Sequence, residues 1–165
     1  MVSVVTGGPT GATDNDASVA GPDCLICQKH AGVGPLVSPH LWEDDLVRVS
    51  HIPPVDEPKA FVGHLVIETQ RHVGYLDELS DDEAAAVGRA ARTAARAIRA
   101  ELGAESVFSA VIGIGVPHFH QHVWPKHPGT PDRYDWHRVD EWPDAPRAIG
   151  DELDTICDRL RPYFT

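Results

Sequence analysis

Three histidines alternate with other residues in the stretch Val-Pro-His-Phe-His-Gln-His-Val-Trp, at positions His118, His120 and His122. Because successive side chains on a β-strand point to opposite faces, this spacing predicts three imidazoles on one face of a strand, with Phe119 and Val123 on the other. Imidazole is a nucleophile and proton carrier near neutral pH, and it is also the commonest metal ligand. The row therefore indicates a reactive or metal-binding site, and a polar strand face without a function is the alternative.

The residues on either side of the histidines set further expectations. Residues 106–112 are rich in β-branched and aromatic side chains and predict a strand. Gly113 and Gly115 follow it, and glycines in such a place indicate a backbone that closely approaches a ligand, for example a phosphate held by main-chain N–H groups. Pro125 is expected to end the histidine strand because proline lacks the N–H that the next ladder bond requires.

The length and the charge of the chain limit the classes of protein to consider. Its 165 residues suffice for one domain with a real core. A net charge of −11 argues against a surface that binds nucleic acid polymers, because such surfaces cluster lysine and arginine. A small anion could still bind where histidines or backbone amides reverse the local potential. No apolar run approaches the ~20 residues that cross a bilayer and no signal peptide pattern is present, so we expect a cytoplasmic protein.

A pair of cysteines, Cys24 and Cys27, stands near the N-terminus with two residues between them. Two thiolates at this spacing can bind one tetrahedral zinc if two further ligands come from elsewhere in the chain. A redox pair and unliganded thiols are the alternatives, although a redox pair usually opens a helix after a buried strand, and a polar stretch precedes this one. That stretch, residues 1–21, is expected to be a disordered tail, and residues 22–165 are expected to form a single domain.

Two strands are expected between the cysteines and the middle of the chain. Residues 41–45 predict a turn that leads into a strand over 46–52, which stops at two prolines. A second strand is expected over 61–67. His64 and His72 lie within and just after this second strand, and they are either ordinary polar residues at strand ends or part of a site.

The clearest helix begins at a capping box formed by Ser80 and Glu83, and Gly103 is expected to stop it. Its apolar residues recur at intervals of three and four, which gives one stripe for packing on a sheet. The arginines of this helix are expected to face solvent, with phosphate binding as the alternative. A second helix is expected over 148–163, with Cys157 as a core residue on its apolar stripe. The long connection before it, rich in Pro, Asp, Trp and His, is of a kind that often carries function.

Three motifs together carry a resemblance to the histidine triad superfamily of nucleotidyl hydrolases and transferases. The sequence His-x-His-x-His-Val-Trp at 118–124 resembles the signature of that superfamily. Gly63-His64 and Arg71-His72 resemble its Gly-His and Arg-His segments, and the Cys-x-x-Cys at 24–27 resembles the zinc knuckle of its zinc-bearing bacterial branch. The resemblance implies an α+β fold with an antiparallel sheet of about five strands, one long helix, a C-terminal helix and a homodimeric assembly.

The resemblance also implies roles for individual residues. His120 would be the nucleophile that attacks an α-phosphate and forms a covalent nucleotidyl-imidazole intermediate, and His122 would bind or orient the phosphate. A structural zinc would be held by Cys24, Cys27, His72 and His118. The substrates would be purine nucleotides or dinucleoside polyphosphates, and the residues expected to contact them are His64, His51, Gly113, Gly115 and Gln121.

The chain departs from the family pattern at two places. Many members have Gly-Gln-Ser before the triad, with the serine near the leaving group, where this chain has Gly113-Ile114-Gly115. In many members an aspartate holds the ribose hydroxyls, and its position aligns near His51 of this chain. Gln121, between the last two histidines, resembles the pattern of the dinucleoside polyphosphate phosphorylases of the family. A nucleotide-binding or sensing protein without turnover is therefore one alternative to an enzyme of this type. A metallohydrolase in which all three histidines share a catalytic metal is the other.

Overall fold

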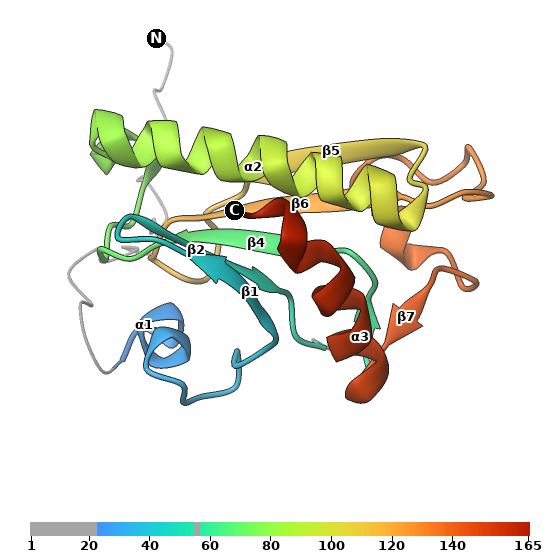
Figure 1. Cartoon of the computed structure of the whole chain (residues 1–165), viewed down its shortest axis with the longest axis horizontal. Coiled ribbons are helices and arrows are strands. Elements are labelled where there is room, and N and C mark those ends of the chain that lie inside the picture. Colours follow the sequence, from blue (N-terminus) through green and yellow to red (C-terminus); the bar gives the residue numbers. More distant parts are fainter. Residues whose placement is uncertain (1–22, 55–56) are drawn as a thin grey trace, which may run out of the picture.

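The structure, a computed structural model, describes residues 23–54 and 57–165 (Figure 1). Its centre is an antiparallel sheet of five strands in the order β1-β2-β4-β6-β5. These strands are β1 (His40–Glu43), β2 (Val47–His51), β4 (Leu65–Thr69), β6 (His120–Lys126) and β5 (Ser106–Val111). A separate small sheet pairs β3 (Ala60–Phe61) with β7 (Arg147–Ala148). The expected α+β fold is confirmed, and the tail expected over residues 1–21 lies outside the described residues.

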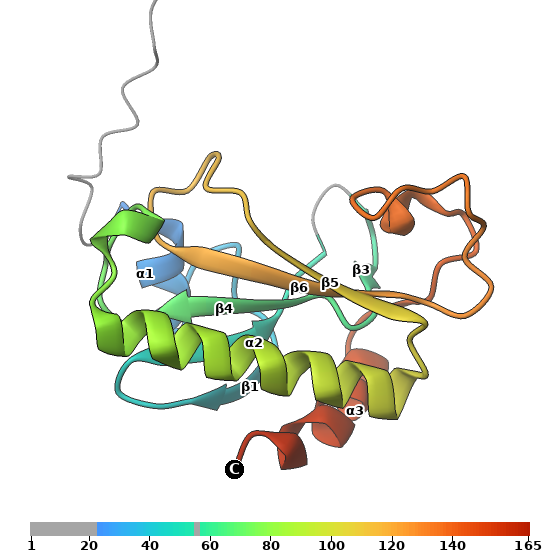
Figure 2. The ribbon, with the colours of Figure 1, turned by 90° about the horizontal axis from the view of Figure 1, so that it is seen from above.

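Helices cover both faces of the sheet. The long helix α2 (Asp81–Leu102) crosses one face, and the short helix α1 (Leu25–His30) lies on the other (Figure 1). Seen from above, α1 lies at one end of the sheet and the loop of residues 127–146 lies at the opposite end (Figure 2). The other helices are α3 (Asp151–Leu160) and the single turns η1 (Leu76–Glu78), η2 (Val139–Glu141) and η3 (Arg161–Tyr163). Among the described residues, no helix combines the length and the apolar content that crossing a membrane requires.

Helix α2 forms where the sequence predicts it. The Ser80 hydroxyl accepts a hydrogen bond from the Glu83 backbone N–H, and the Glu83 carboxylate accepts one from the Ser80 N–H, so the capping box is complete. Gly103 ends the helix in the left-handed conformation, with φ of 64°. The face toward the sheet is mostly alanine, which allows a close approach to the buried side chains of β4 and β6. The four arginines of the helix are exposed, as expected.

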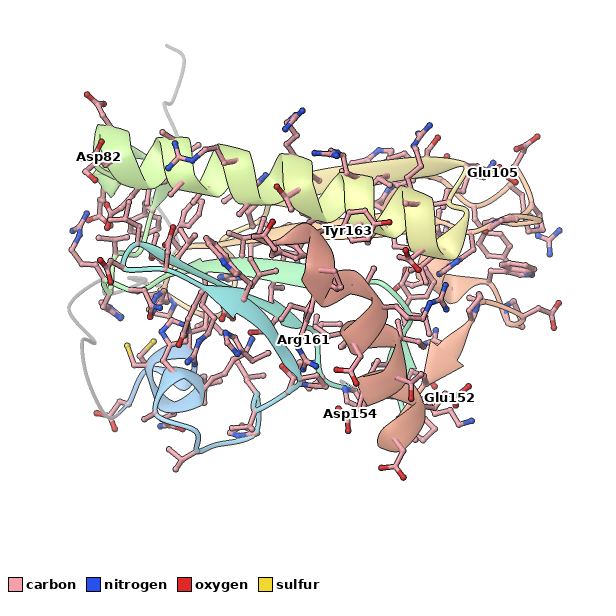
Figure 3. All side chains as sticks on the ribbon, viewed as in Figure 1. Asp82, Glu105, Glu152, Asp154, Arg161 and Tyr163 are labelled. Atoms are coloured by element: carbon pink, nitrogen blue, oxygen red, sulfur yellow. The ribbon has the colours of Figure 1, made fainter. Side chains whose placement is uncertain are left out.

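Helix α3 is shorter than the expected span of 148–163. Arg147 and Ala148 instead pair with β3, and Gly150 then turns the chain into the helix at Asp151. Buried Leu153, Cys157 and Leu160 form the apolar stripe, so the prediction for Cys157 is confirmed. The C-terminal turn η3 is tied to α2, because the Tyr163 hydroxyl donates a 2.8 Å hydrogen bond to the Glu101 carboxylate. Figure 3 shows Tyr163 next to α2.

Two predictions for the N-terminal strands were wrong. Residues 41–43 belong to strand β1 and not to a turn, because the turn starts later, where the Asp44 carboxylate accepts hydrogen bonds from the backbone N–H groups of Leu46 and Val47. The strand expected over 61–67 is divided into β3 and β4 by Gly63, whose φ is 82°. The backbone conformation favours glycine, and a Cβ atom at this position would also lie 2.5 Å from a methyl carbon of Leu102, which would have to move.

The histidine strand begins later and ends later than expected. His118 lies before it, because its N–H bonds back to the carbonyl of Val116, and β6 starts at His120. The strand continues through Pro125, which we expected to end it. The Glu105 N–H donates to the Lys126 carbonyl on the β5 side, so the nitrogen of Pro125 faces the β4 side, where pairing stops at Val123. Proline is tolerated at such an edge position because no partner needs its missing N–H.

Candidate active site and metal centre

Four potential metal ligands meet beside α1. Cys24 and Cys27 stand at the start of that helix, His72 follows the end of β4, and His118 immediately precedes β6. Their ligand atoms all lie within 4.8 Å of one another. The His118 Nδ1 lies 3.5 Å from each cysteine sulfur, and the His72 Nδ1 lies 3.4 Å from the Cys27 sulfur. The packing of α1 beside the ends of β4 and β6 therefore brings together residues that are far apart in the sequence.

These distances fit a tetrahedral zinc. Bonds of ~2.3 Å to sulfur and ~2.0 Å to nitrogen at tetrahedral angles separate neighbouring sulfur and nitrogen atoms by ~3.5 Å. The His118 Nε2 lies 2.8 Å from the carbonyl of Thr69, to which it donates, and this fixes the tautomer whose Nδ1 lone pair faces the sulfurs. Cys24 and His118 are 2% and 1% exposed, so the cluster is largely closed to water. Donor set, distances and burial all suit zinc.

His120 points its reactive atom away from this cluster. Its Nδ1 lies 2.7 Å from the carbonyl oxygen of His118, to which it donates, so the lone pair is on Nε2. His120 and His122 line a cavity of about 130 Å³ whose other walls are mostly apolar. An imidazole fixed in this tautomer beside a small cavity can attack an electrophile that binds there.

His122 and His64 form a second pair of histidines. The His64 Nε2 and the His122 Nδ1 are 3.0 Å apart and share one proton in a hydrogen bond. Burial lowers the pKa of His64 to about 3, and burial together with the neighbouring His120 lowers the pKa of His122 to about 4. Both rings are therefore neutral at pH 7 and can interact with a ligand as hydrogen-bond donors rather than as cations.

A buried ion pair lies in the wall of the same cavity. Lys29 of α1 contacts the Glu68 carboxylate of β4 at 2.9 Å, and the other carboxylate oxygen lies 3.2 Å from His30. Lys29 and Glu68 both line the cavity beside His120. Sequence analysis missed these residues, because nothing in the sequence indicates that the single acidic residue of an apolar strand pairs with a lysine 39 positions earlier.

The other residues predicted to contact the substrate do not line the cavity beside His120. His51 is fully buried and uses both ring nitrogens, with Nδ1 donating to the Ile52 carbonyl at 2.8 Å and Nε2 accepting from the Gly63 N–H at 3.0 Å. Gln121 alternates with the histidines along β6 and donates instead to the Ser109 hydroxyl, 2.8 Å away. Gly113 and Gly115 adopt φ of 66° and 94° with open space around them.

No family model and no curated protein sequence matches the chain. Solved structures do match its fold. A zinc-bound histidine triad family protein from Mycobacterium smegmatis is 22% identical, with 86% of this chain and 92% of that one covered and a TM-score of 0.61. A Hit-like protein involved in cell-cycle regulation from Bartonella henselae, solved with an unknown ligand, is 16% identical, with coverages of 86% and 96% and a TM-score of 0.64.

A third solved structure matches over a similar share of both chains. A hypothetical histidine triad nucleotide-binding protein from Sulfolobus tokodaii is 16% identical, with 85% of this chain and 91% of that one covered and a TM-score of 0.62. The three proteins share with this chain an architecture that spans nearly their whole length. The chain therefore has the histidine triad fold, as the resemblance of its motifs implied.

Proposed function

We propose that the protein is a nucleotidyl hydrolase or transferase that cleaves the phosphoryl bond of a nucleoside 5′-phosphoramidate or a dinucleoside polyphosphate. The observation that carries the proposal is the state of His120. Its Nδ1 donates to the His118 carbonyl, so its Nε2 lone pair faces a cavity that can hold a phosphoryl group. Nucleotide binding is in keeping with the similarity of the fold to the histidine triad nucleotide-binding protein from Sulfolobus tokodaii.

The proposed reaction has two steps. In the first, the His120 Nε2 forms a bond to the α-phosphorus, and the bond from phosphorus to the leaving nitrogen or oxygen breaks. The bonding pair departs with the leaving group, which takes up a proton from the solvent. In the second, water or another acceptor attacks phosphorus and releases the nucleotide from His120. When the shared proton is on the His64 Nε2, the His122 Nδ1 accepts the hydrogen bond and the His122 Nε2 is protonated. This Nε2–H then donates a hydrogen bond to a phosphoryl oxygen.

We also propose that the metal is structural. Cys24, Cys27, His72 and His118 would hold it, and zinc bound to four protein ligands supplies a cross-link between α1 and the sheet rather than an activated water. The attacking group in the proposed reaction is therefore His120. The alternative in which three histidines share a catalytic metal does not suit this arrangement, because the His118 Nδ1 faces the cysteines.

The test is to quench turnover of labelled adenosine and guanosine phosphoramidates and dinucleoside polyphosphates, and to search for an acid-labile, base-stable adduct on the peptide that contains His120. We expect the adduct, and we expect turnover without added divalent metal. Inversion of configuration at phosphorus, or turnover without an adduct, would contradict covalent catalysis. Tight nucleotide binding without turnover would favour a sensing protein instead.

We further propose a homodimer that forms along β5. This strand lies at the edge of the sheet, and Val111 and Ile112 at its end are exposed. An uncovered edge strand with apolar side chains is a ready surface for pairing with a second copy. Light scattering after gel filtration should give the mass of a dimer for the wild type and a lower mass for Val111→Lys. A monomeric wild type would contradict the assembly without affecting the proposed chemistry.

A further inference from the structure

A second cavity adjoins the histidines on the side away from α1. It has a volume of about 230 Å³, and His64 and His122 form part of its lining. The remaining walls are mainly aromatic, with Phe61 of β3, Trp124 of β6 and Trp136 of the loop 127–146. We call this cavity the aromatic pocket. His122 also lines the cavity beside His120, so the aromatic pocket and the proposed phosphoryl site share one wall.

The aromatic walls are held in place before any ligand binds. The Trp124 indole N–H donates to the Trp136 carbonyl at 2.9 Å, and the two ring centres are 5.9 Å apart. Val139, which is 1% exposed, anchors the loop in a core cluster with Phe61 and Trp124. Trp136 itself is 52% exposed, so an indole face remains open to solvent at the pocket. A rigid pocket with an open aromatic face suits a ligand that stacks.

The volume limits what can enter. An engineered cavity of about 150 Å³ in another protein takes up benzene. The aromatic pocket, at about 230 Å³, is therefore large enough for a group of one or two fused rings and too small to enclose a second complete nucleotide. Asp140 is also part of the lining, and its carboxylate favours a ligand that carries a hydrogen-bond donor.

The arrangement of the two cavities indicates which part of a substrate belongs in each. His122 lines both cavities, whereas His120 lines only the one next to α1. In a displacement at phosphorus the attacking and leaving atoms lie roughly in line, on opposite sides of the phosphorus. A phosphoryl group attacked by His120 and bound by His122 would therefore direct its leaving group away from the His120 cavity, which is toward the aromatic pocket.

We propose that the aromatic pocket binds the leaving group of the substrate, and that this group is a flat aromatic ring system joined to phosphorus through an amine or an alcohol. The inference rests on the proposed function, because a leaving group presupposes cleavage at phosphorus. In the step concerned, the bond from His120 to phosphorus forms, the bond from phosphorus to the leaving atom breaks, and the released amine or alcohol takes up a proton from the solvent.

The test compares two substrates that differ in aromaticity alone. Adenosine 5′-phosphoramidates of phenethylamine and of cyclohexylethylamine have leaving groups of equal carbon number and similar basicity. We expect kcat/KM to be about five- to tenfold higher for the phenethyl compound, in keeping with the usual contribution of aromatic stacking. Trp136→Leu should abolish this preference, whereas Trp136→Phe should retain most of it.

A matched variant controls for effects of the loop itself. Trp142 lies in the same loop and packs on the same core cluster but does not line the pocket, so Trp142→Leu should keep the preference. Equal kcat/KM for both compounds, or an equal loss for both in Trp136→Leu, would overturn the inference and leave the proposed function intact. If neither these compounds nor dinucleoside polyphosphates are turned over, the proposed function fails, and calorimetry of the binding of the two phosphoramidates then decides on the aromatic pocket. Preferential binding of the phenethyl compound that Trp136→Leu abolishes would support the aromatic pocket, and equal binding would overturn it.

Discussion

The two ends of the histidine face differ in how much open space surrounds their side chains. At the end with the two cysteines, Cys24 and His118 are almost fully buried and their ligand atoms lie 3.5 Å apart, a spacing that suits a bound metal ion. At the other end, His120 and His122 border one cavity, His122 borders a second cavity as well, and Trp136 keeps half of its surface exposed. We call these regions the metal end and the open end.

This contrast arises within a few residues of one chain. His118 and His120 are two positions apart, yet the first faces the cysteines and the second faces a cavity. The hydrogen bond from the His120 ring to the His118 carbonyl links the two ends directly. Similar residue types can therefore serve stability at one end and chemistry at the other, and the predictions below test this division.

The largest effect is expected at the open end. His120→Ala should lower turnover at least ~10⁴-fold, because it removes the proposed nucleophile and with it the proposed covalent route. Zinc content and melting temperature should remain near the wild-type values, since the ring does not face the cysteines. Steady-state kinetics, elemental analysis and calorimetry measure the three quantities. An equal loss of zinc from His120→Ala and His118→Ala would remove the distinction between the two ends.

The complementary change at the metal end is His118→Ala. We expect zinc content to fall and the free energy of unfolding to drop by about 4 kcal/mol, which is at the upper end of single-substitution effects, because metal binding contributes to folding. A strong chelator should lower the melting temperature of the wild type more than that of the variant. Elemental analysis that finds no zinc in wild-type protein purified without added metal would contradict this prediction.

Acid should destabilise the protein through a residue outside the metal end. Burial lowers the pKa of His51 to about 4, against 6.5 for the free side chain. The folded state then binds fewer protons than the unfolded state below pH 6.5, so stability that is fully present above that pH is lost as the pH falls toward 4. The loss amounts to about 3 kcal/mol at 1.36 kcal/mol per pKa unit.

The pH dependence can be separated from zinc release by comparison with His51→Gln. Denaturant unfolding between pH 7 and 4 should show a shallower loss of stability in this variant, although its stability at pH 7 is lower. The difference in unfolding free energy between the wild type and the variant isolates the contribution of His51, because both proteins keep the four metal ligands. Parallel curves for the two proteins would assign the whole acid effect to other groups.

The smallest effect concerns the start of α2, which lies at the same end of the molecule as α1 (Figure 1). Ser80→Ala removes the hydroxyl that accepts from the Glu83 N–H and should cost about 1 kcal/mol of stability. Turnover at saturating substrate should not change. Ser80→Thr keeps a capping hydroxyl and should behave like the wild type. A marked fall in turnover in Ser80→Ala would show that the open end depends on the packing of α2.

The sequence predicted those elements whose signals are local. The span of α2 follows from the capping box at Ser80 and from Gly103, and both act within one turn of the helix. Strand β6 was misjudged at both ends, because the effect of Pro125 depends on where β4 stops pairing, and that is a long-range property. Strand β1 was misjudged for a different reason, because the Asp44 side chain fixes its turn locally, and composition alone did not show where the turn begins.

The candidate site shows the same limit. The histidine row and the cysteine pair are visible as spacings, but the two cavities beside His122 form only when α1 and the loop 127–146 cover the sheet. The buried contact between Lys29 and Glu68 likewise joins residues with no common motif. The importance of Trp136 could be suspected only from the composition of its loop.

The separation of the metal ligands along the chain bears on how the protein is made. Cys24 and His118 are 94 residues apart, and Cys27 and His72 are 45 apart, so their meeting requires most of the sheet to be assembled first. Contacts between such distant residues slow folding, because the entropy of closing long loops is lost before the contacts form. On a ribosome, Cys24 and Cys27 emerge long before His118 is synthesised. The two thiols thus remain open to oxidation until the last ligand arrives, and zinc capture would mark the completion of the fold.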